Sequence, residues 1–370
     1  MRLRTNPEMV IGYDDDLKLF RSRLTQVAML VLLVVYLFLP LQIDDFWLGV
    51  LNFVAIFAIG GIGLNLLTGY TGQVSLGTAF FVAVGAFTAA YLGGDLGWPL
   101  WAWLPAAAFL GAALGALIGP IALRLSGNYL AIVTLGLLFL GEHIFSNWRV
   151  VTGGGRGTRV NASLALGPLD FADLNVFGTS YSRAQGIFWL LWIAVAVTAL
   201  VAKNIVRSRP GRAMQAIRDR DIAAEVVGVS LLRYKLGAFA ISSAMAAVAG
   251  GFYGAAIQQF VSPSEFGGQL GLVLSIQYIA VIIIGGLGTI YGAILGALVV
   301  GALPRIIQEF SSSLPFLVSG PGDDGIVSVA SFNNMLFGLL IIVFLMAEPL
   351  GLAALWMRLK AYFKFWPFSY

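Results

Sequence analysis

The sequence contains no cysteine, a single histidine and few charged residues, and each scarcity excludes a class of protein. Without cysteine the chain has no disulfide framework, no thiol catalysis and no thiolate-held zinc or iron–sulfur centre. A lone histidine cannot build a metal site without carboxylates beside it, and the sequence offers no such cluster. It also lacks paired carboxylates or a nucleophile beside a base, so it does not favour an enzyme.

Charged residues make up only 11% of the chain, against about 25% in ordinary soluble domains. In their place stand 59% hydrophobic residues and 45 glycines, and the mean hydropathy is +0.89. A soluble chain of 370 residues could not bury so much apolar surface, whereas membrane helices face lipid and use glycine to pack closely. The composition therefore predicts an all-α polytopic protein in a lipid bilayer. The net charge of +4 fits basic cytoplasmic loops and does not indicate nucleic-acid binding.

Membrane-spanning helices need about 20 predominantly apolar residues. Such runs predict about ten spans, at 24–41, 46–67, 74–93, 100–124, 129–146, 186–206, 236–258, 270–287, 290–307 and 332–349. No cleavable signal peptide is expected, because the chain begins with a long polar and acidic stretch. We therefore expect an N-terminal segment, 1–23, a transmembrane domain, 24–349, and a C-terminal tail, 350–370.

The orientation follows from the distribution of basic residues among the loops. The chain has 22 Lys and Arg. With an even number of spans and the N-terminus inside, most of them fall in inward segments, and the outward loops hold only Arg149, Arg156, Arg159, Arg183 and Arg305. The positive-inside rule then predicts a multi-pass membrane protein with both termini in the cytoplasm. The long outward loops, 147–185 and 308–331, are either plain connections or docking surfaces for an extracytoplasmic partner.

A charged segment, residues 207–235 (RSRPGRAMQAIRDRDIAAEVVGVSLLRYK), interrupts the apolar sequence. Pro210 and Gly211 end the sixth span, and helix-forming residues follow. Met214, Ile217 and Ala224 fall near one side of the predicted helix, and most of its charges fall elsewhere. This pattern suits insertion into a groove on a partner; the alternative is a solvated loop whose charges only set the topology.

Two glycine-rich breaks interrupt apolar helices, one at 63–80 (GLNLLTGYTGQVSLGTAF) and one at 282–292 (IIIGGLGTIYG). Backbone groups freed at such breaks can contact the ammonium and carboxylate of a zwitterion. The alternative is that glycines only allow close helix packing and polar side chains bond across helices. The predicted pathway residues are Asn65, Thr68, Gly69, Gly72, Gln73, Ser75, Thr78, Ser275, Gln277, Gly285, Gly286 and Gly288. Whether the two breaks form an inverted repeat stays open.

Glu142 is a further pathway candidate, because an ionisable residue at membrane depth suggests function. It lies near the outer end of the fifth predicted span, beside His143 and close to Asn147. Anchoring at the membrane interface is therefore the alternative reading.

Several sequence blocks, in order, resemble one family. They are NLLTGYTGQVSLGTAFFVAVGAF at 65–87, SGNYLAIVTLGLLFLGE at 126–142, VTGGGRG at 151–157, the stretch from RPGRAM to GFYGA at 209–255, FVSP at 260–263 and IIIGGLGTIYGAILGA at 282–297. The chain thereby resembles the inner-membrane permeases of branched-chain amino acid ABC importers, LivM type. The resemblance implies a permease subunit that takes branched-chain or related hydrophobic amino acids from a periplasmic binding protein and passes them inward by ATP-driven alternating access. It also implies a second, LivH-like permease and two cytoplasmic ATPase subunits of the LivG/LivF kind.

In such importers a cytoplasmic helix couples the ATPase to the pathway, and the resemblance assigns that role to part of 207–235. The implied coupling residues are Arg212, Met214, Ile217, Arg218, Asp219, Ala223, Ala224, Glu225 and Gly228. The importer pattern Glu-Ala-Ala, three residues, then Gly is matched except that Ile222 stands at the Glu position.

No lysine of the chain lies in a Gly-Lys-Ser/Thr phosphate loop. We therefore expect no cofactor in this chain, and ATP and magnesium only in the partner subunits. Two other functions remain open. The same family resemblance extends to permeases for urea, short amides or another small solute, and an ATP-independent secondary transporter or channel is disfavoured by the few buried charges.

Overall fold

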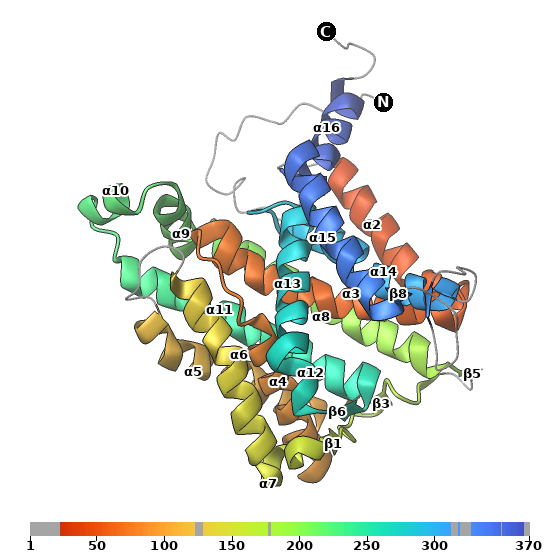
Figure 1. The fold of residues 1–370 in the computed structure, drawn as a ribbon. Helices are drawn as coiled ribbons and strands as arrows, with labels where there is room; N and C mark the ends of the chain where they lie inside the picture. Colours follow the sequence, from red (N-terminus) through yellow and green to blue (C-terminus); the bar gives the residue numbers. More distant parts are fainter. Residues whose placement is uncertain are drawn as a thin grey trace.

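A computed structural model of the chain describes residues 23–122, 129–176, 179–311, 317–318, 327–348 and 350–365. These residues form a helical bundle (Figure 1). The α-helices are α2 (Arg23–Phe38), α3 (Asp45–Leu64), α4 (Thr78–Thr88), α5 (Leu100–Ala122), α6 (Tyr129–Asn147), α7 (Arg149–Thr152), α8 (Arg183–Arg207), α9 (Arg209–Asp219), α10 (Asp221–Val226), α11 (Leu231–Phe252), α12 (Pro263–Phe266), α13 (Gly268–Gly285), α14 (Ile290–Phe310), α15 (Val329–Ala347) and α16 (Gly351–Phe365).

The remaining elements are short. Two are 3₁₀ turns, η1 (Leu39–Leu41) and η4 (Gly154–Arg156), and three are π turns, η2 (Asn65–Gly69), η3 (Ala89–Asp95) and η5 (Tyr253–Gln258). The two-residue strands are β1 (Thr158–Arg159), β2 (Ala165–Leu166), β3 (Leu169–Asp170), β4 (Asn175–Val176), β5 (Thr179–Ser180), β6 (Phe260–Val261), β7 (Leu317–Val318) and β8 (Val327–Ser328). Each strand pairs with one other strand, so none of them builds an extended sheet.

The described residues contain eight helices long and apolar enough to span a membrane. A ninth is counted if Ser331–Met346 and Gly351–Leu359, which meet at 52°, form one bent span. The first predicted span is represented by a shorter apolar helix, Leu30–Leu41. The fold class is therefore the predicted one, although the count of full-length spans is below the expected ten, because the helices at the two ends of the chain are short or bent.

Helices α3 and α11 form the centre of the bundle. α3 packs against α14, α8 and α11, and α11 packs against α5 and α4. In the apolar window of α3 and η2, 89% of the residues are buried, against 28% in α5. The polar groups of interest on η2 therefore lie inside the protein and not at the lipid surface.

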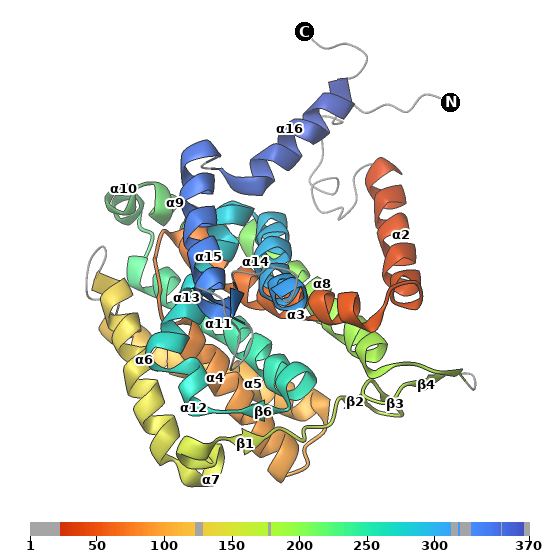
Figure 2. The same ribbon diagram turned by 45° about the vertical axis from the view of Figure 1, so that its right-hand side comes forward.

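The charged segment and the outward loop lie at opposite ends of the molecule. In both views α9 and α10 project from the upper end, where α16 also lies (Figures 1 and 2). α7, β1 and β6 lie at the lower end, where Thr158 of β1 faces Val261 of β6. The loop expected at 147–185 is thus partly ordered, with α7, η4 and strands β1 to β5 in its described part. Most of the loop expected at 308–331, and all but one residue of the N-terminal segment, lie outside the described residues.

Candidate functional site

The first glycine-rich break separates α3 from α4. α3 continues through the π turn η2 and a final helical turn to Thr71, and helix resumes only at Thr78. Gly72, between them, has φ of +72°, a left-handed conformation that glycine adopts without strain. π turns are rare and are frequent at functional sites, since they displace backbone groups from the regular hydrogen-bonding pattern.

Side chains from other helices satisfy the backbone of this break. The Thr134 hydroxyl of α6 accepts a hydrogen bond from Leu76 N at 2.9 Å. The Ser275 hydroxyl of α13 accepts one from Ala79 N at 3.1 Å, in the first turn of α4, where helices leave N–H groups without intrahelical partners. Ser275, predicted as a pathway residue, therefore has a defined structural contact with the break.

The second break is the turn between α13 and α14. Gly286 and Gly288 have φ of +117° and +75°, so both positions favour glycine. The break therefore lies where the glycine pattern predicts it, and it divides 270–307 into two helices. Gly285, at the end of α13, packs so closely on the Gly292 carbonyl that a Cβ atom would overlap it.

The two breaks touch each other through Asn65. Asn65 Nδ2 donates to the Thr289 carbonyl at 2.7 Å, and Gly288 N donates to Asn65 Oδ1 at 2.9 Å. Gly69 lies in the same contact, because a Cβ atom there would come within 2.5 Å of Gly288 N. Stretches more than 200 residues apart in the chain therefore form one partly buried polar contact.

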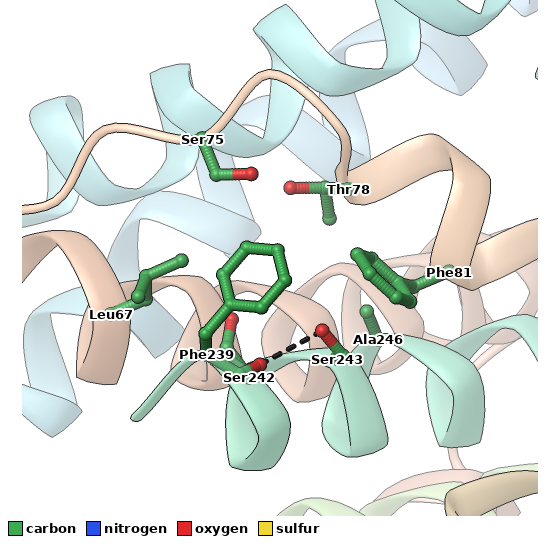
Figure 3. Close-up of a pocket in the computed structure, with 8 residues that line it drawn as sticks. All are labelled: Leu67, Ser75, Thr78, Phe81, Phe239, Ser242, Ser243 and Ala246. Atoms are coloured by element: carbon green, nitrogen blue, oxygen red, sulfur yellow. Dashed lines mark hydrogen bonds between the residues drawn. The ribbon is translucent and has the colours of Figure 1, made fainter. Parts of the chain in front are cut away.

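A small cavity lies between the loop of the first break and α11 (Figure 3). It offers about 10 Å³ to the centres of water molecules, room for roughly one water. Ser75 and Thr78 point into it from the loop side, opposite serines of α11. Its lining residues are Leu67, Ser75, Thr78, Phe81, Phe239, Ser242, Ser243 and Ala246.

Ser242 and Ser243 are the residues that sequence reasoning missed. Both are buried, and the Ser243 hydroxyl donates to the Phe239 carbonyl at 2.8 Å (Figure 3). The signal was the pair of adjacent serines inside the apolar run of 236–258, which contains no other polar side chain nearby. Their approach to Ser75 and Thr78 depends on the packing of α11 against α4 and cannot be seen in the sequence.

Other predicted pathway residues differ in their surroundings. The Thr68 hydroxyl donates to the Gln73 carbonyl at 2.9 Å, within the first break. Gln73 is 8% exposed, and its Oε1 is a buried acceptor without a partner, a costly state for a polar atom. Gln277 is half-buried in α13. Glu142 packs against Gly267 and Gly268 at the beginning of α13, so the structure groups it with the α12–α13 junction and not with the two breaks.

The charged segment folds as two helices and not as one continuous helix. Arg220, with φ of −156° and ψ of 97°, separates α9 from α10. Met214 and Ile217 are 2% and 3% exposed, and Ala224 is also buried. The apolar face predicted to insert into a partner's groove is therefore already covered by this chain; that prediction was wrong because the face packs inward.

A different apolar group is exposed on α10 and the turn after it. Ile222, Val226 and Val227 are 77%, 83% and 83% exposed. Among the predicted coupling residues, Arg212, Asp219, Ala223, Glu225 and Gly228 are exposed as well. Arg218 is exposed too, but its Nη1 donates to the Gly69 carbonyl at 2.5 Å.

Among the described residues, no group of three or more His, Asp or Glu could hold a metal ion. The chemistry of the site is that of hydroxyl, amide and backbone groups, which suits binding of a polar solute. That these residues line a substrate pathway stays a prediction.

Comparison with known proteins identifies the class. Residues 46–345 match the family described as the permease component of branched-chain amino acid transport systems, and the chain belongs to that family of transport permeases. It is 33% identical over 313 residues to the high-affinity branched-chain amino acid transport system permease protein LivM of Escherichia coli (strain K12), covering 81% of this chain and 72% of that protein.

Two further relatives show how wide the family is. Identity to the LivH permease protein of Escherichia coli (strain K12) is 27% over 276 residues, 70% of this chain and 83% of that protein. Identity to the ribose import permease protein RbsC of Haemophilus influenzae is 26% over 257 residues, 69% of this chain and 73% of that protein. No solved structure matches the chain.

Proposed function

We propose that this chain is the LivM-type permease subunit of an ATP-driven importer and passes branched-chain or related hydrophobic amino acids inward. The observation that carries the proposal is the junction at Asn65, which holds two broken helices together beside the charged segment. The similarity to LivM supports the choice of substrate, since it is higher and covers more of the chain than the similarity to the ribose permease.

The cavity beside the first break supports transport by alternating access. Leucine is far larger than the single water that fits there, so substrate can pass only after α11 and the first break move apart. Hydroxyls of Ser75, Thr78 and Ser242 would then face the substrate's charged ends, while Leu67 and Phe81 supply an apolar wall. A pathway closed at one stage and open at another is what alternating access requires.

The partners follow from the surfaces of the chain. A LivH-like permease would complete the pathway, since this chain resembles both members of that pair. Two cytoplasmic ATPase subunits, which hold ATP and magnesium, would contact α10 through Ile222, Val226 and Val227, because exposed apolar groups on a polar segment favour a protein contact. A periplasmic binding protein would dock on the opposite end, around β1 and β6.

Uptake by the reconstituted complex tests the substrate. Proteoliposomes that contain the permease pair, the ATPases and the binding protein are supplied with radiolabelled leucine, ribose or urea. We expect ATP-dependent leucine uptake that unlabelled isoleucine and valine suppress. Uptake of ribose or urea without leucine uptake would refute the substrate, and leucine uptake without ATPase subunits would refute the importer.

The α10 surface has its own test. Replacing both Val226 and Val227 by Ser should weaken co-purification of the ATPase subunits at least tenfold, since it removes exposed apolar contacts and no internal packing. Leu96→Ser, at an apolar side chain that is 51% exposed elsewhere, is the matched control and should leave co-purification unchanged. Equal co-purification of all three proteins would exclude α10 as the docking element.

A further inference from the structure

The guanidinium of Arg218 lies where the charged segment meets both breaks. Nη1 donates to the Gly69 carbonyl at 2.5 Å, at the end of the π turn of the first break. A Cβ atom on Gly72 would lie 3.7 Å from Arg218 Cγ, so this loop passes over the arginine stem. A Cβ atom on Gly288 would lie 2.6 Å from Nη1, so the second break borders the same group. One side chain of α9 therefore contacts the first break and closely borders the second.

The bond is of a strong kind, and among the described residues Arg218 makes no competing hydrogen bond or ion pair. A charged donor forms shorter and stronger hydrogen bonds than a neutral one, and the C-terminal carbonyls of a helical turn lack intrahelical donors. No carboxylate of the described residues lies within 4.0 Å of the Arg218 guanidinium. Arg212, by contrast, donates to the Arg207 carbonyl within its own segment at 3.1 Å. Arg218 thus differs from its neighbour in linking the segment to the core.

Movement of α9 would reach the pathway through this bond. Gly69 ends η2, whose first residue, Asn65, holds the second break through Gly288 and Thr289. Displacing α9 must therefore either carry Gly69 with it or break the bond. Because Ile217 anchors α9 inward next to Arg218, the segment can act on the break as a packed body and not as a loose loop.

We propose that Arg218 is a positioning residue that transmits movement of the charged segment to both glycine breaks through the Gly69 carbonyl. This inference rests on the proposed function, since it assumes that an ATPase moves the segment. In this inference Arg218 links α9 to the first break, and the exposed apolar side chains of α10 and the turn after it bind the ATPase. Arginine suits the role because a planar fork with several donors can hold one carbonyl while bordering a second loop.

The test separates transport from ATP hydrolysis. The reconstituted complex is assayed for leucine uptake and phosphate release with Arg218→Gln, Arg218→Lys and Arg220→Gln. We expect Arg218→Gln to assemble and hydrolyse ATP but to import at least tenfold less leucine per ATP. Arg218→Lys, which keeps the charge and an N–H donor but not the planar fork, should recover part of this ratio. Arg220→Gln removes a neighbouring exposed charge and should leave the ratio as in the parent.

A cysteine reporter gives a second, independent readout, because the chain contains no native cysteine. Val74, 42% exposed in the loop of the first break, is replaced by Cys. Trapping the complex with ATP and vanadate should change its rate of labelling by a water-soluble maleimide several-fold. The change should disappear when Arg218→Gln is combined with it. A purely stabilising role for Arg218 would leave the response in place.

The outcomes distinguish this inference from the proposed function. If the Arg218→Gln complex imports leucine per ATP within twofold of the parent and keeps the labelling response, the inference is overturned while the proposed function stands. If the parent complex imports no leucine with ATP, the proposed function fails first. Should Arg218→Gln not insert, Arg218→Lys decides: a parental import ratio and labelling response overturn the inference, and a lowered ratio supports it.

Discussion

The side chain of Asn65 joins the two glycine-rich breaks. Its donor and acceptor are both used, on a carbonyl and an N–H of the second break. Buried polar groups are tolerated when they are paired in this way and are costly when they are not. The alternative given for the polar residues, hydrogen bonding across helices, therefore applies to Asn65. Asn65 also lies between the two candidate pathway elements.

Asn65→Ala should destabilise the chain measurably. It leaves Gly288 N and the Thr289 carbonyl without their partner in a half-buried site. Full burial would cost about 1–3 kcal/mol for each group, and partial access to water lowers that cost. The thermal unfolding midpoint in detergent should fall clearly, whereas Asn204→Ala, at an exposed residue of α8, should leave it within error. Equal midpoints for the two variants would show that the junction between the breaks is not formed.

Glu265 predicts a pH dependence. Burial raises the pKa of Glu265, against a smaller opposing effect of its backbone hydrogen bond with Ser262, and Oε2 has no partner. The unfolded chain then loses this proton at lower pH than the folded one. The contribution of Glu265 to stability therefore declines as pH rises from the ordinary carboxyl range through the raised pKa.

Glu265→Gln removes this titration. Relative to the parent, the variant should gain thermal stability as pH rises from the ordinary carboxyl range through the raised pKa, because the parent alone must ionise a partly buried carboxyl. The measurement is the difference between the two unfolding midpoints across that range. A difference independent of pH would mean that Glu265 is solvated in the folded protein.

At the scale of elements, the contact between α4 and α11 depends on two glycines, one in each helix, and each glycine faces the backbone of the other helix. A Cβ atom on Gly85 would overlap the Ala247 carbonyl, and one on Gly250 would overlap the Val82 carbonyl. Such close approach is typical of membrane helices, where small residues permit backbone packing. It also sets the distance between the serines of α11 and the first break.

Gly250→Ala should therefore separate α11 from α4 and reduce the yield of folded protein. Overpacking of this kind costs about 1–3 kcal/mol or more. Gly237→Ala, in the same helix, meets no atom within 4 Å and should be neutral or stabilising, since alanine has the higher helix propensity. Comparable folded yields for the two variants, by gel filtration, would contradict the packing of α4 on α11.

In the charged segment, the presence of helix could be predicted from the sequence, but its division and its orientation could not. Its helix-forming composition and its position between apolar runs predicted a helix correctly, and Pro210 at the first turn of α9 fits the preference of proline for that position. The break at Arg220 and the inward direction of the Met214 face were not predictable. A period of 3.6 residues identifies an apolar face but not which surface will cover it.

For the whole molecule, the arrangement of the ends predicts an orientation. α9, α10 and α16 lie at one end, and β1 and β6 lie at the other (Figures 1 and 2). The end with α9 and α10 carries Arg212, Arg218 and Arg220, as the positive-inside rule requires of a cytoplasmic surface. We therefore infer that α9, α10 and the C-terminal helix face the cytoplasm.

Single cysteines test this orientation in a chain that has none of its own. Leu166→Cys, 42% exposed on β2, should react with a membrane-impermeant maleimide in intact spheroplasts. Arg220→Cys should react only after lysis. Labelling in the reverse pattern would invert the topology and place the proposed ATPase contact on the wrong side of the membrane.

The sequence by itself determined the class of protein, most of the spans, both glycine breaks and the position of the charged segment. These features depend on apolar run length, on glycine and on local charge, which are properties of neighbouring residues. Only the tertiary structure decided that Asn65 joins the two breaks, that Ser242 and Ser243 face the first of them and that Arg218 bonds to the Gly69 carbonyl. Each of these contacts unites residues far apart in the chain, and their pairing depends on how helices pack, which no local pattern specifies.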